Sequence, residues 1–129
     1  MLSLVSVALG SALGGSARYL TNEWVIARLG AGFPFGTMTV NIIGSLILGL
    51  LAGLVVGGSR PMLPDQARLL FMTGFCGSYT TFSTFSLQTL ELFEAGYPLR
   101  ALANILGSLI LCLSAVYLGV ILGNALSRP

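Results

Sequence analysis

Long apolar stretches separated by short polar segments dominate the pattern of this chain. Charged residues are absent from positions 1–17, 29–59, 69–90 and 101–127. Even the stretch 69–90 would extend about 33 Å as an α-helix, which is enough to cross the hydrocarbon core of a bilayer. The pattern therefore predicts four membrane-spanning helices, near residues 2–22, 35–56, 67–92 and 99–126.

Glycine and proline mark the predicted connections at 30–34, 57–64 and 96–98, as expected for turns. The first apolar run is short before it meets Arg18, so we place Arg18 near the membrane edge or facing a watery cavity. Because no basic residue precedes this run, it lacks the charged start of a cleaved signal peptide. We therefore expect it to be a permanent helix.

Composition supports an integral membrane protein. The 129 residues include six arginines, four acidic residues, no lysine and no histidine, and 55% are hydrophobic. The charged share is 8%, whereas soluble domains carry about 25%. Mean hydropathy is +0.93. We expect one all-α domain over 1–129 in contact with the lipid bilayer, and no basic stripe of the kind that binds nucleic acid.

The arginines give no preferred orientation. Four spans place Arg60, Arg68 and Arg128 on one side of the membrane and Arg18, Arg28 and Arg100 on the other. Orientation normally follows an excess of basic residues in cytoplasmic loops, and here the count is three against three. Two interpretations stay open: both orientations insert and form an antiparallel dimer, or one arginine dominates and the topology is single.

The third span has an unusual polar centre. Its nine positions 78–86 hold seven hydroxyl side chains and two phenylalanines. Hydroxyl groups in hydrocarbon need partners, so this density indicates a polar interior. We expect the helix to break at Gly77, since broken backbone at membrane depth is tolerated where it is buried or lines a cavity. A packed polar helix is the alternative.

The chain lacks most catalytic chemistry. It has no histidine, its carboxylates all lie near span ends, and no base accompanies its many hydroxyls. A proton-coupled exporter would need an ionisable group inside the membrane. We therefore expect neither an enzyme nor a proton-driven antiporter.

Uncharged hydrogen-bond donors recur at helical spacing instead. Two sets repeat every four residues and so share a helix face: Thr37, Asn41 and Ser45 on the second span, and Asn104, Ser108 and Cys112 on the fourth. Phe82 and Phe85 also face roughly one way. Amide and hydroxyl donors with the positive edges of phenyl rings would dehydrate a small anion without trapping it. The phenylalanine pair would equally suit ordinary core packing.

Three motifs carry a resemblance to a known family. They are Gly-Gly-Ser-Ala-Arg-Tyr at 14–19, Gly-Thr-Met-Thr-Val-Asn-Ile-Ile-Gly at 36–44 and Gly-Phe-Cys-Gly-Ser-Tyr-Thr-Thr-Phe-Ser-Thr-Phe at 74–85. In this order and spacing the chain resembles the Fluc, or CrcB-type, fluoride channels over nearly its whole length. It departs from them at Ser78-Tyr79, where Gly-Phe is usual, and at Ser11.

The resemblance implies passive export of fluoride across the cell inner membrane by an antiparallel, dual-topology homodimer of multi-pass chains. It makes Phe82 and Phe85 the paired pore phenylalanines, and Asn41 and Ser108 polar lining residues. We expect fluoride also to pass the hydroxyls of Ser83 and Thr84. Two roles stay open for Arg18: it attracts anions into a vestibule, or it extends to the membrane interface.

The resemblance further implies a structural Na⁺ at the centre of the dimer. The backbone carbonyls of Gly77 and Thr80 would hold it, and two chains around a two-fold axis would offer four oxygens. Unwound carbonyls coordinate Na⁺ in other membrane proteins.

Two other classes of function stay open. A small multidrug transporter matches the size and the possible dual topology, but it would need a membrane-embedded glutamate. A non-transporting assembly subunit would explain the glycine pairs, but not seven hydroxyls in nine residues.

Overall fold

The computed structural model describes residues 1–56 and 63–127, and all regular secondary structure in these ranges is helical. The predicted positions of Arg60 and Arg128 lie outside the described residues. The elements are α1 (Leu2–Leu29), α2 (Phe35–Val56), α3 (Asp65–Arg68), the π-helix η1 (Leu69–Cys76), α4 (Gly77–Tyr79), α5 (Phe82–Glu94) and α6 (Pro98–Ser127).

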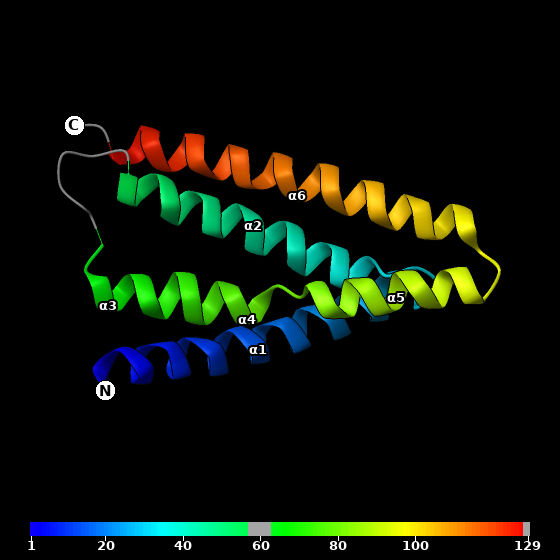
Figure 1. Cartoon of the computed structure of the whole chain (residues 1–129), viewed down its shortest axis with the longest axis horizontal. Helices are drawn as coiled ribbons and strands as arrows, with labels where there is room; N and C mark the ends of the chain where they lie inside the picture. The colour runs from blue at the N-terminus through cyan, green and yellow to red at the C-terminus, as the bar shows by residue number, and fades with distance from the viewer. Residues whose placement is uncertain (57–62, 128–129) are drawn as a thin grey trace.

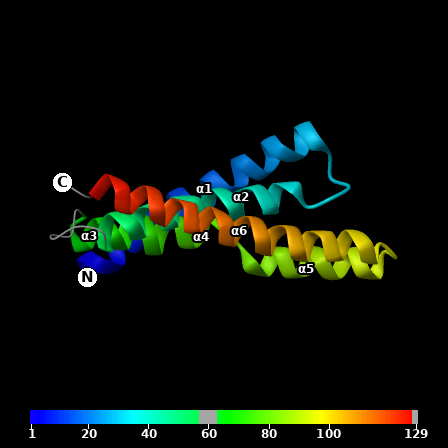
Figure 2. The same ribbon diagram turned by 90° about the horizontal axis from the view of Figure 1, so that it is seen from above.

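The long helices lie in two pairs. Helix α2 runs alongside α6, and α1 runs alongside the segment formed by α3, η1 and α4 (Figure 1). Helix α5 continues the direction of that segment beyond a short interruption and packs against the first half of α6. Seen from above, the second half of α1 diverges from the other helices (Figure 2).

Glycines bring α2 and α6 into backbone contact. A Cβ atom added at Gly49 would collide with the carbonyl oxygen of Val116, and one added at Gly119 would collide with that of Leu46. Gly53 and Gly123 approach each other one turn further along. Helix association in lipid depends on such close packing, because lipid tails are as apolar as the side chains.

The contact between α1 and η1 is built in the same way. An added Cβ at Gly10 would meet the carbonyl oxygen of Leu70, and one at Gly14 would meet that of Phe75. From the other side, a Cβ at Gly74 would lie 2.7 Å from the carbonyl oxygen of Val7. Both helix pairs are therefore joined by seams of small residues.

Helix α1 is longer than the first predicted span. It continues seven residues beyond position 22 and ends at Leu29, where Gly30 adopts a φ of 78°. The helix end is set by this glycine, which accepts a backbone conformation that other residues rarely adopt. The charges at 18, 23 and 28 do not end it.

The third predicted span is interrupted, but not at Gly77. Gly77 keeps helical angles, with φ −62° and ψ −28°. The extended residues are Thr80 (ψ 158°) and Thr81 (φ −152°, ψ 112°), and α5 begins directly after them. The Thr81 hydroxyl caps α5 by accepting a hydrogen bond from the Thr84 backbone N–H, at 3.3 Å.

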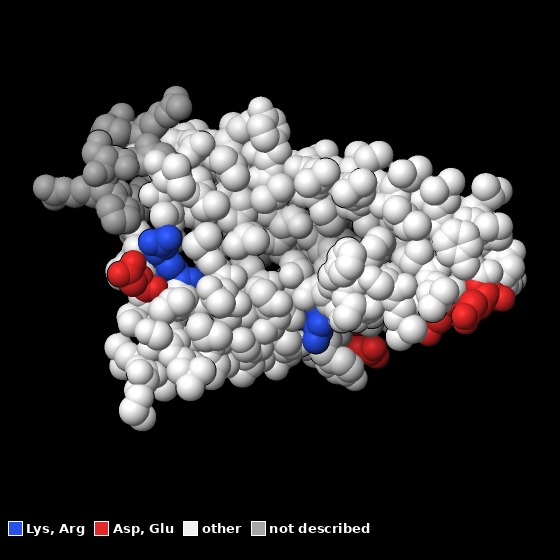
Figure 3. Space-filling model, viewed as in Figure 1, with Lys and Arg blue, Asp and Glu red and all other residues white. Residues whose placement is uncertain are grey.

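The surface agrees with a membrane protein. Helices α2 and α6 are long and apolar enough to cross a bilayer, with mean hydropathies of 2.3 and 2.5 over their most apolar windows. Large apolar side chains are exposed along every long helix. Figure 3 shows a face that is mostly uncharged, with its basic and acidic side chains near the left-hand end and along the lower edge.

Candidate functional site

The helix break is held open by one asparagine on α2. Asn41 Oδ1 accepts a hydrogen bond from the Thr81 N–H at 2.8 Å, and Asn41 Nδ2 donates to the Thr81 carbonyl at 3.2 Å. One amide side chain therefore satisfies both backbone groups of an extended residue. This matters at membrane depth, where an unpaired backbone group is costly.

This pairing changes the hydrogen bonding of the preceding turn. In an uninterrupted α-helix, the Thr81 N–H would donate to the Gly77 carbonyl. Because Asn41 takes that N–H, the Gly77 oxygen loses its helical donor. Thr80 remains tied to the helix, since its N–H and its Oγ1 both donate to the Cys76 carbonyl at 3.1 and 3.0 Å.

Beside the break lies a pocket of about 520 Å³ between α2, α5 and α6, here called the phenylalanine pocket. Its polar lining comes from Asn41, Ser45, Thr80, Thr81, Ser108 and Cys112. Phe82, Phe85 and aliphatic side chains form the rest. A mostly apolar wall with a few placed polar groups is typical of binding sites.

Phe82 and Phe85 form a tilted pair at this pocket. Their ring centroids are 5.5 Å apart and their planes meet at 42°. Phe82 is 79% exposed in the single chain, whereas Phe85 is half-buried. The predicted pair is therefore brought together, with one ring uncovered by any other part of the chain that the structure describes.

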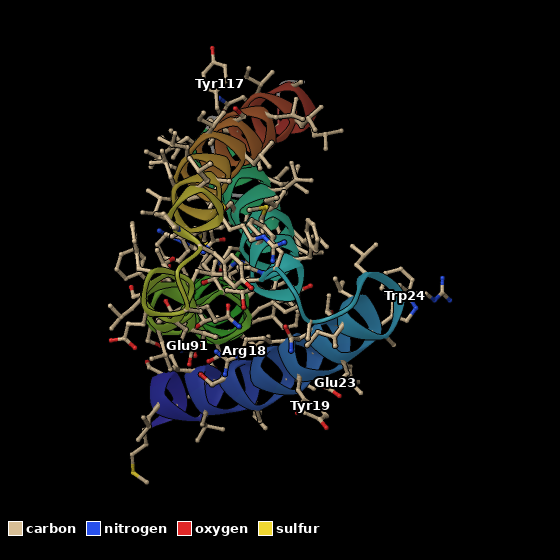
Figure 4. All side chains as sticks on the ribbon, turned by 90° about the vertical axis from the view of Figure 1, so that its right-hand side faces the viewer. Arg18, Tyr19, Glu23, Trp24, Glu91 and Tyr117 are labelled. Atoms are coloured by element: carbon tan, nitrogen blue, oxygen red, sulfur yellow. The ribbon has the colours of Figure 1, made fainter. Side chains whose placement is uncertain are left out.

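A second pocket, of about 200 Å³, lies between α1, α2 and α5 and is here called the arginine pocket. Its polar lining residues are Arg18, Asn22, Thr37, Thr81, Thr84 and Gln88. The Arg18 side chain projects from α1 toward the α5 side of the bundle (Figure 4), and Tyr19 also borders the pocket. Within the described residues, Gln88 Oε1 is buried without a hydrogen-bond partner.

Thr81 lines both pockets. Its side chain accepts from the Thr84 N–H and donates to Thr84 Oγ1 at 2.9 Å, while its backbone is held by Asn41. The break thus separates a pocket containing a guanidinium group from one containing phenyl rings. One extended residue forms the partition.

The predicted lining residues divide between these places. Asn41, Phe82, Phe85 and Ser108 meet at the phenylalanine pocket, whereas Thr84 lies at the arginine pocket. Ser83 is an exposed residue that lines neither pocket, and its hydroxyl lies 3.3 Å from Thr81 Oγ1. The difference follows from helical phase, because α5 begins at Phe82 and successive residues turn about 100°.

Sequence reasoning missed Thr81 and Gln88 as members of the site. Gln88 lies four residues after Thr84 on one face of α5, and Thr81, three residues before Thr84, is the residue that caps this helix. That periodicity is visible in the sequence once the start of the helix is known.

Tyr79, at the departure from the family motif, joins the break to α1. The Tyr79 hydroxyl lies 3.2 Å from Thr21 Oγ1, which itself bonds to the Ala17 carbonyl. Its ring stacks on Phe75 with centroids 5.6 Å apart. The extra hydroxyl therefore finds a partner in a buried position.

No group of three or more His, Cys, Asp or Glu side chains gathers anywhere in ranges 1–56 and 63–127. The oxygen atoms near the break therefore belong to backbone carbonyls, hydroxyls and the Asn41 amide. The Gly77 oxygen, freed by the diversion of the Thr81 N–H, suits the binding of a cation.

Comparison with known proteins places the chain in a family. Residues 5–120 match the family described as CrcB-like protein, Camphor Resistance (CrcB). A "fluoride-specific ion channel FluC" of Magnetococcus marinus is 46% identical over 95% of this chain and 98% of its own length. The FluC proteins of Paramagnetospirillum magneticum (46%; 99% of this chain and 100% of the relative) and Geobacter metallireducens (42%; 93% and 95%) are similar.

These relatives are named as ion channels and not as enzymes, so the expectation that the chain is no enzyme is confirmed by its family. Their names also confirm the resemblance carried by the three sequence motifs. With the two apolar helices, they identify a membrane protein. The chain belongs to the CrcB-like protein family.

Proposed function

We propose that this chain is a fluoride-selective channel that passively exports fluoride and so lowers its cytoplasmic concentration. The names of its relatives support the ion and the class of protein. The observation that carries the proposal in this chain is the placement of Phe82, Phe85 and Ser108 around one pocket beside a helix break. The chain would cross the inner membrane several times.

The route we propose begins in the arginine pocket. A single guanidinium group raises the local concentration of anions, and the Thr37 and Thr84 hydroxyls replace part of their water. The ion then passes Thr81 and Asn41 and enters the phenylalanine pocket. Asn41 Nδ2 carries a second hydrogen besides the one it gives to Thr81, and this hydrogen is available to the ion.

The phenylalanine pocket supplies weak, distributed contacts. The edge of each phenyl ring is positive, and Ser108 adds a hydroxyl donor. No arginine within residues 1–56 and 63–127 lines this pocket, which suits conduction because a binding site must also release the ion. A small, strongly basic anion gains most from such donors. This property would favour fluoride over chloride.

An antiparallel, dual-topology homodimer fits the uncovered surface. Phe82 is largely exposed, and Gly77 and Phe71 also lie open on the third-span segment. A second copy would cover these groups and close the pocket. The predicted balance of three arginines on each side of the membrane supports insertion in both orientations.

A structural Na⁺ at the dimer centre fits the freed Gly77 carbonyl and the extended Thr80 residue. When bound, the ion supplies positive charge that braces the two breaks against each other. Asn41 contributes by keeping the Thr81 N–H away from Gly77. If fluoride flux and dimer stability are the same with Na⁺ and with N-methylglucamine as the only cation, this part of the proposal is wrong.

The test of the function is efflux from liposomes that contain only this purified protein. We expect rapid fluoride loss, measured with a fluoride electrode, and no chloride loss from matched vesicles. A pH gradient should leave the rate unchanged, because the ion moves alone. Equal leakage of both anions would contradict selectivity. No flux from folded dimers would favour an assembly subunit.

A further inference from the structure

The most deeply buried amide side chain of the described bundle belongs to Asn104 on α6, and the proposed route does not use it. Asn104 is 1% exposed and does not line the phenylalanine pocket. Its Nδ2 donates a hydrogen bond of 2.8 Å to Thr89 Oγ1 on α5. Burying an amide in an apolar membrane protein is unfavourable without such partners.

Asn104 stands in the middle of a chain of hydrogen bonds. Ser108 Oγ donates to Asn104 Oδ1 at 3.5 Å, Asn104 Nδ2 donates to Thr89 Oγ1, and Thr89 Oγ1 donates to the Phe85 carbonyl at 2.7 Å. This series of hydrogen bonds begins at Ser108 and ends at Phe85, and both residues line the phenylalanine pocket. The series links α6 to α5 through Asn104 and Thr89, two residues that do not line the pocket.

Thr89, the last donor in this series of hydrogen bonds, determines which group donates and which accepts at each step. A hydroxyl has one hydrogen, and Thr89 gives it to the Phe85 carbonyl. Thr89 can therefore only accept from Asn104, which requires the Asn104 NH₂ group to face α5. The Asn104 oxygen must then face Ser108. The orientation of the amide thus follows from the backbone of α5.

The hydrogen bonds at the two ends of this series differ in length and therefore in strength. The bonds of 2.8 and 2.7 Å on the α5 side are of ordinary length, whereas the 3.5 Å between Ser108 Oγ and Asn104 Oδ1 exceeds the usual length of an O–H···O hydrogen bond and marks a weak contact. An anion in the pocket would easily draw the Ser108 hydrogen away from Asn104. The α5 side would stay in place.

We propose that Asn104 is a positioning residue, which holds the Ser108 hydroxyl ready for the ion and fixes the turn of α5 that carries Phe85. Asn104 contacts the ion at no point and acts through its two neighbours. This inference rests on the proposed function, since it concerns the same pocket. It adds Asn104 as a residue that orients both the Ser108 hydroxyl and the Phe85 ring.

The experiment compares fluoride efflux from liposomes for variants of the full chain. Asn104→Leu removes both bonds at similar volume, and we expect an efflux rate about tenfold lower, which corresponds to roughly 1.4 kcal/mol in the barrier. Thr89→Val should lower the rate in the same direction. Thr89→Ser keeps the hydroxyl and should retain the wild-type rate.

A coupling measurement separates positioning from a general loss of structure. In a Thr89→Val, Ser108→Ala background, Asn104 has neither partner, so adding Asn104→Leu should change the rate less than about twofold. A further tenfold loss in that background would overturn the proposal. Wild-type efflux from folded Asn104→Leu would overturn it as well.

Two outcomes remain distinguishable from these. Wild-type protein without fluoride efflux would contradict the proposed function itself, before any variant is compared. If Asn104→Leu does not give a monodisperse dimer, the pair Thr89→Val and Thr89→Ser decides the question. Equal rates in that pair would then overturn the proposal, and a loss confined to the valine variant would support it.

Discussion

Single residues at the helix break carry most of the polar chemistry of this protein. The Asn41 amide forms hydrogen bonds with the backbone N–H and carbonyl of Thr81, and the Thr81 hydroxyl caps α5. The aromatic pair begins at the next residue. A change at one of these positions should therefore affect the helix break and the pocket together.

Replacing Phe85 or Phe82 with leucine should lower fluoride efflux while leaving the protein folded. Leucine fills similar space but offers no positive ring edge, and a contact worth about 1 kcal/mol converts to roughly fivefold in rate. Liposome efflux measures the change. Phe35→Leu, at the start of α2 and away from the pocket, is the matched control. Unchanged efflux in both pore variants would remove the rings from the mechanism.

Replacing Asn41 with leucine should destabilise the protein. Both backbone groups of Thr81 would lose their partner, and each buried unsatisfied group costs about 1–3 kcal/mol. Thermal unfolding in detergent should show a clearly lower midpoint. Ser16→Ala, which removes an exposed hydroxyl bonded to Ala12 of its own helix, should leave the midpoint unchanged. An equally stable Asn41→Leu would show that the break does not depend on this amide.

At the scale of helices, the sequence predicted the elements better than their interruptions. Charge-free stretches located the long helices, because a spanning segment excludes charge. The end of α1 at Leu29 depends on the backbone of Gly30. The break at Thr80–Thr81 depends on Asn41, which is forty residues away in the chain. No local pattern contains that partner, so a nearby glycine was the natural but wrong choice.

The same limit applies to the site. The phenylalanine pair could be predicted from its spacing, and the structure places its two rings together. Ser83 and Thr84 could not be assigned to a pocket, since their direction depends on where α5 begins. Asn104 shares a face with Ser108 in sequence, yet its contact with Thr89 turns it behind the pocket.

The glycine contacts between helices predict opposite effects on the unfolding midpoint for alanine substitutions at two glycines. Gly49→Ala places a Cβ against the Val116 carbonyl, so α2 and α6 must separate and the unfolding midpoint should fall. Gly15→Ala meets no atom within 4 Å and gains about 1 kcal/mol in helix propensity, so its midpoint should hold or rise. The same detergent melting assay compares both. A stable Gly49→Ala would contradict the seam.

At the scale of the whole molecule, orientation can be measured directly. In a variant Ala31→Cys, an exposed loop residue, an impermeant maleimide should label about half of the protein in intact cells if arginine counts govern insertion. Permeabilised cells should show complete labelling. The wild type, whose Cys76 is buried and Cys112 half-buried, gives the background. Labelling of all or none in intact cells would contradict dual topology.

The glycine seams have a consequence for how an ion crosses. A carrier works by rocking one helix group against another, which requires surfaces that can slide. Here carbonyl oxygens of one helix fit against glycines of the next in both pairs, and any sliding would drive them into side chains. These two helix pairs are therefore suited to keeping fixed positions while ions move past them. We expect fluoride flux to rise with temperature as gently as free diffusion does, measured in liposomes whose lipid remains fluid. A steep dependence would indicate that the helix pairs move.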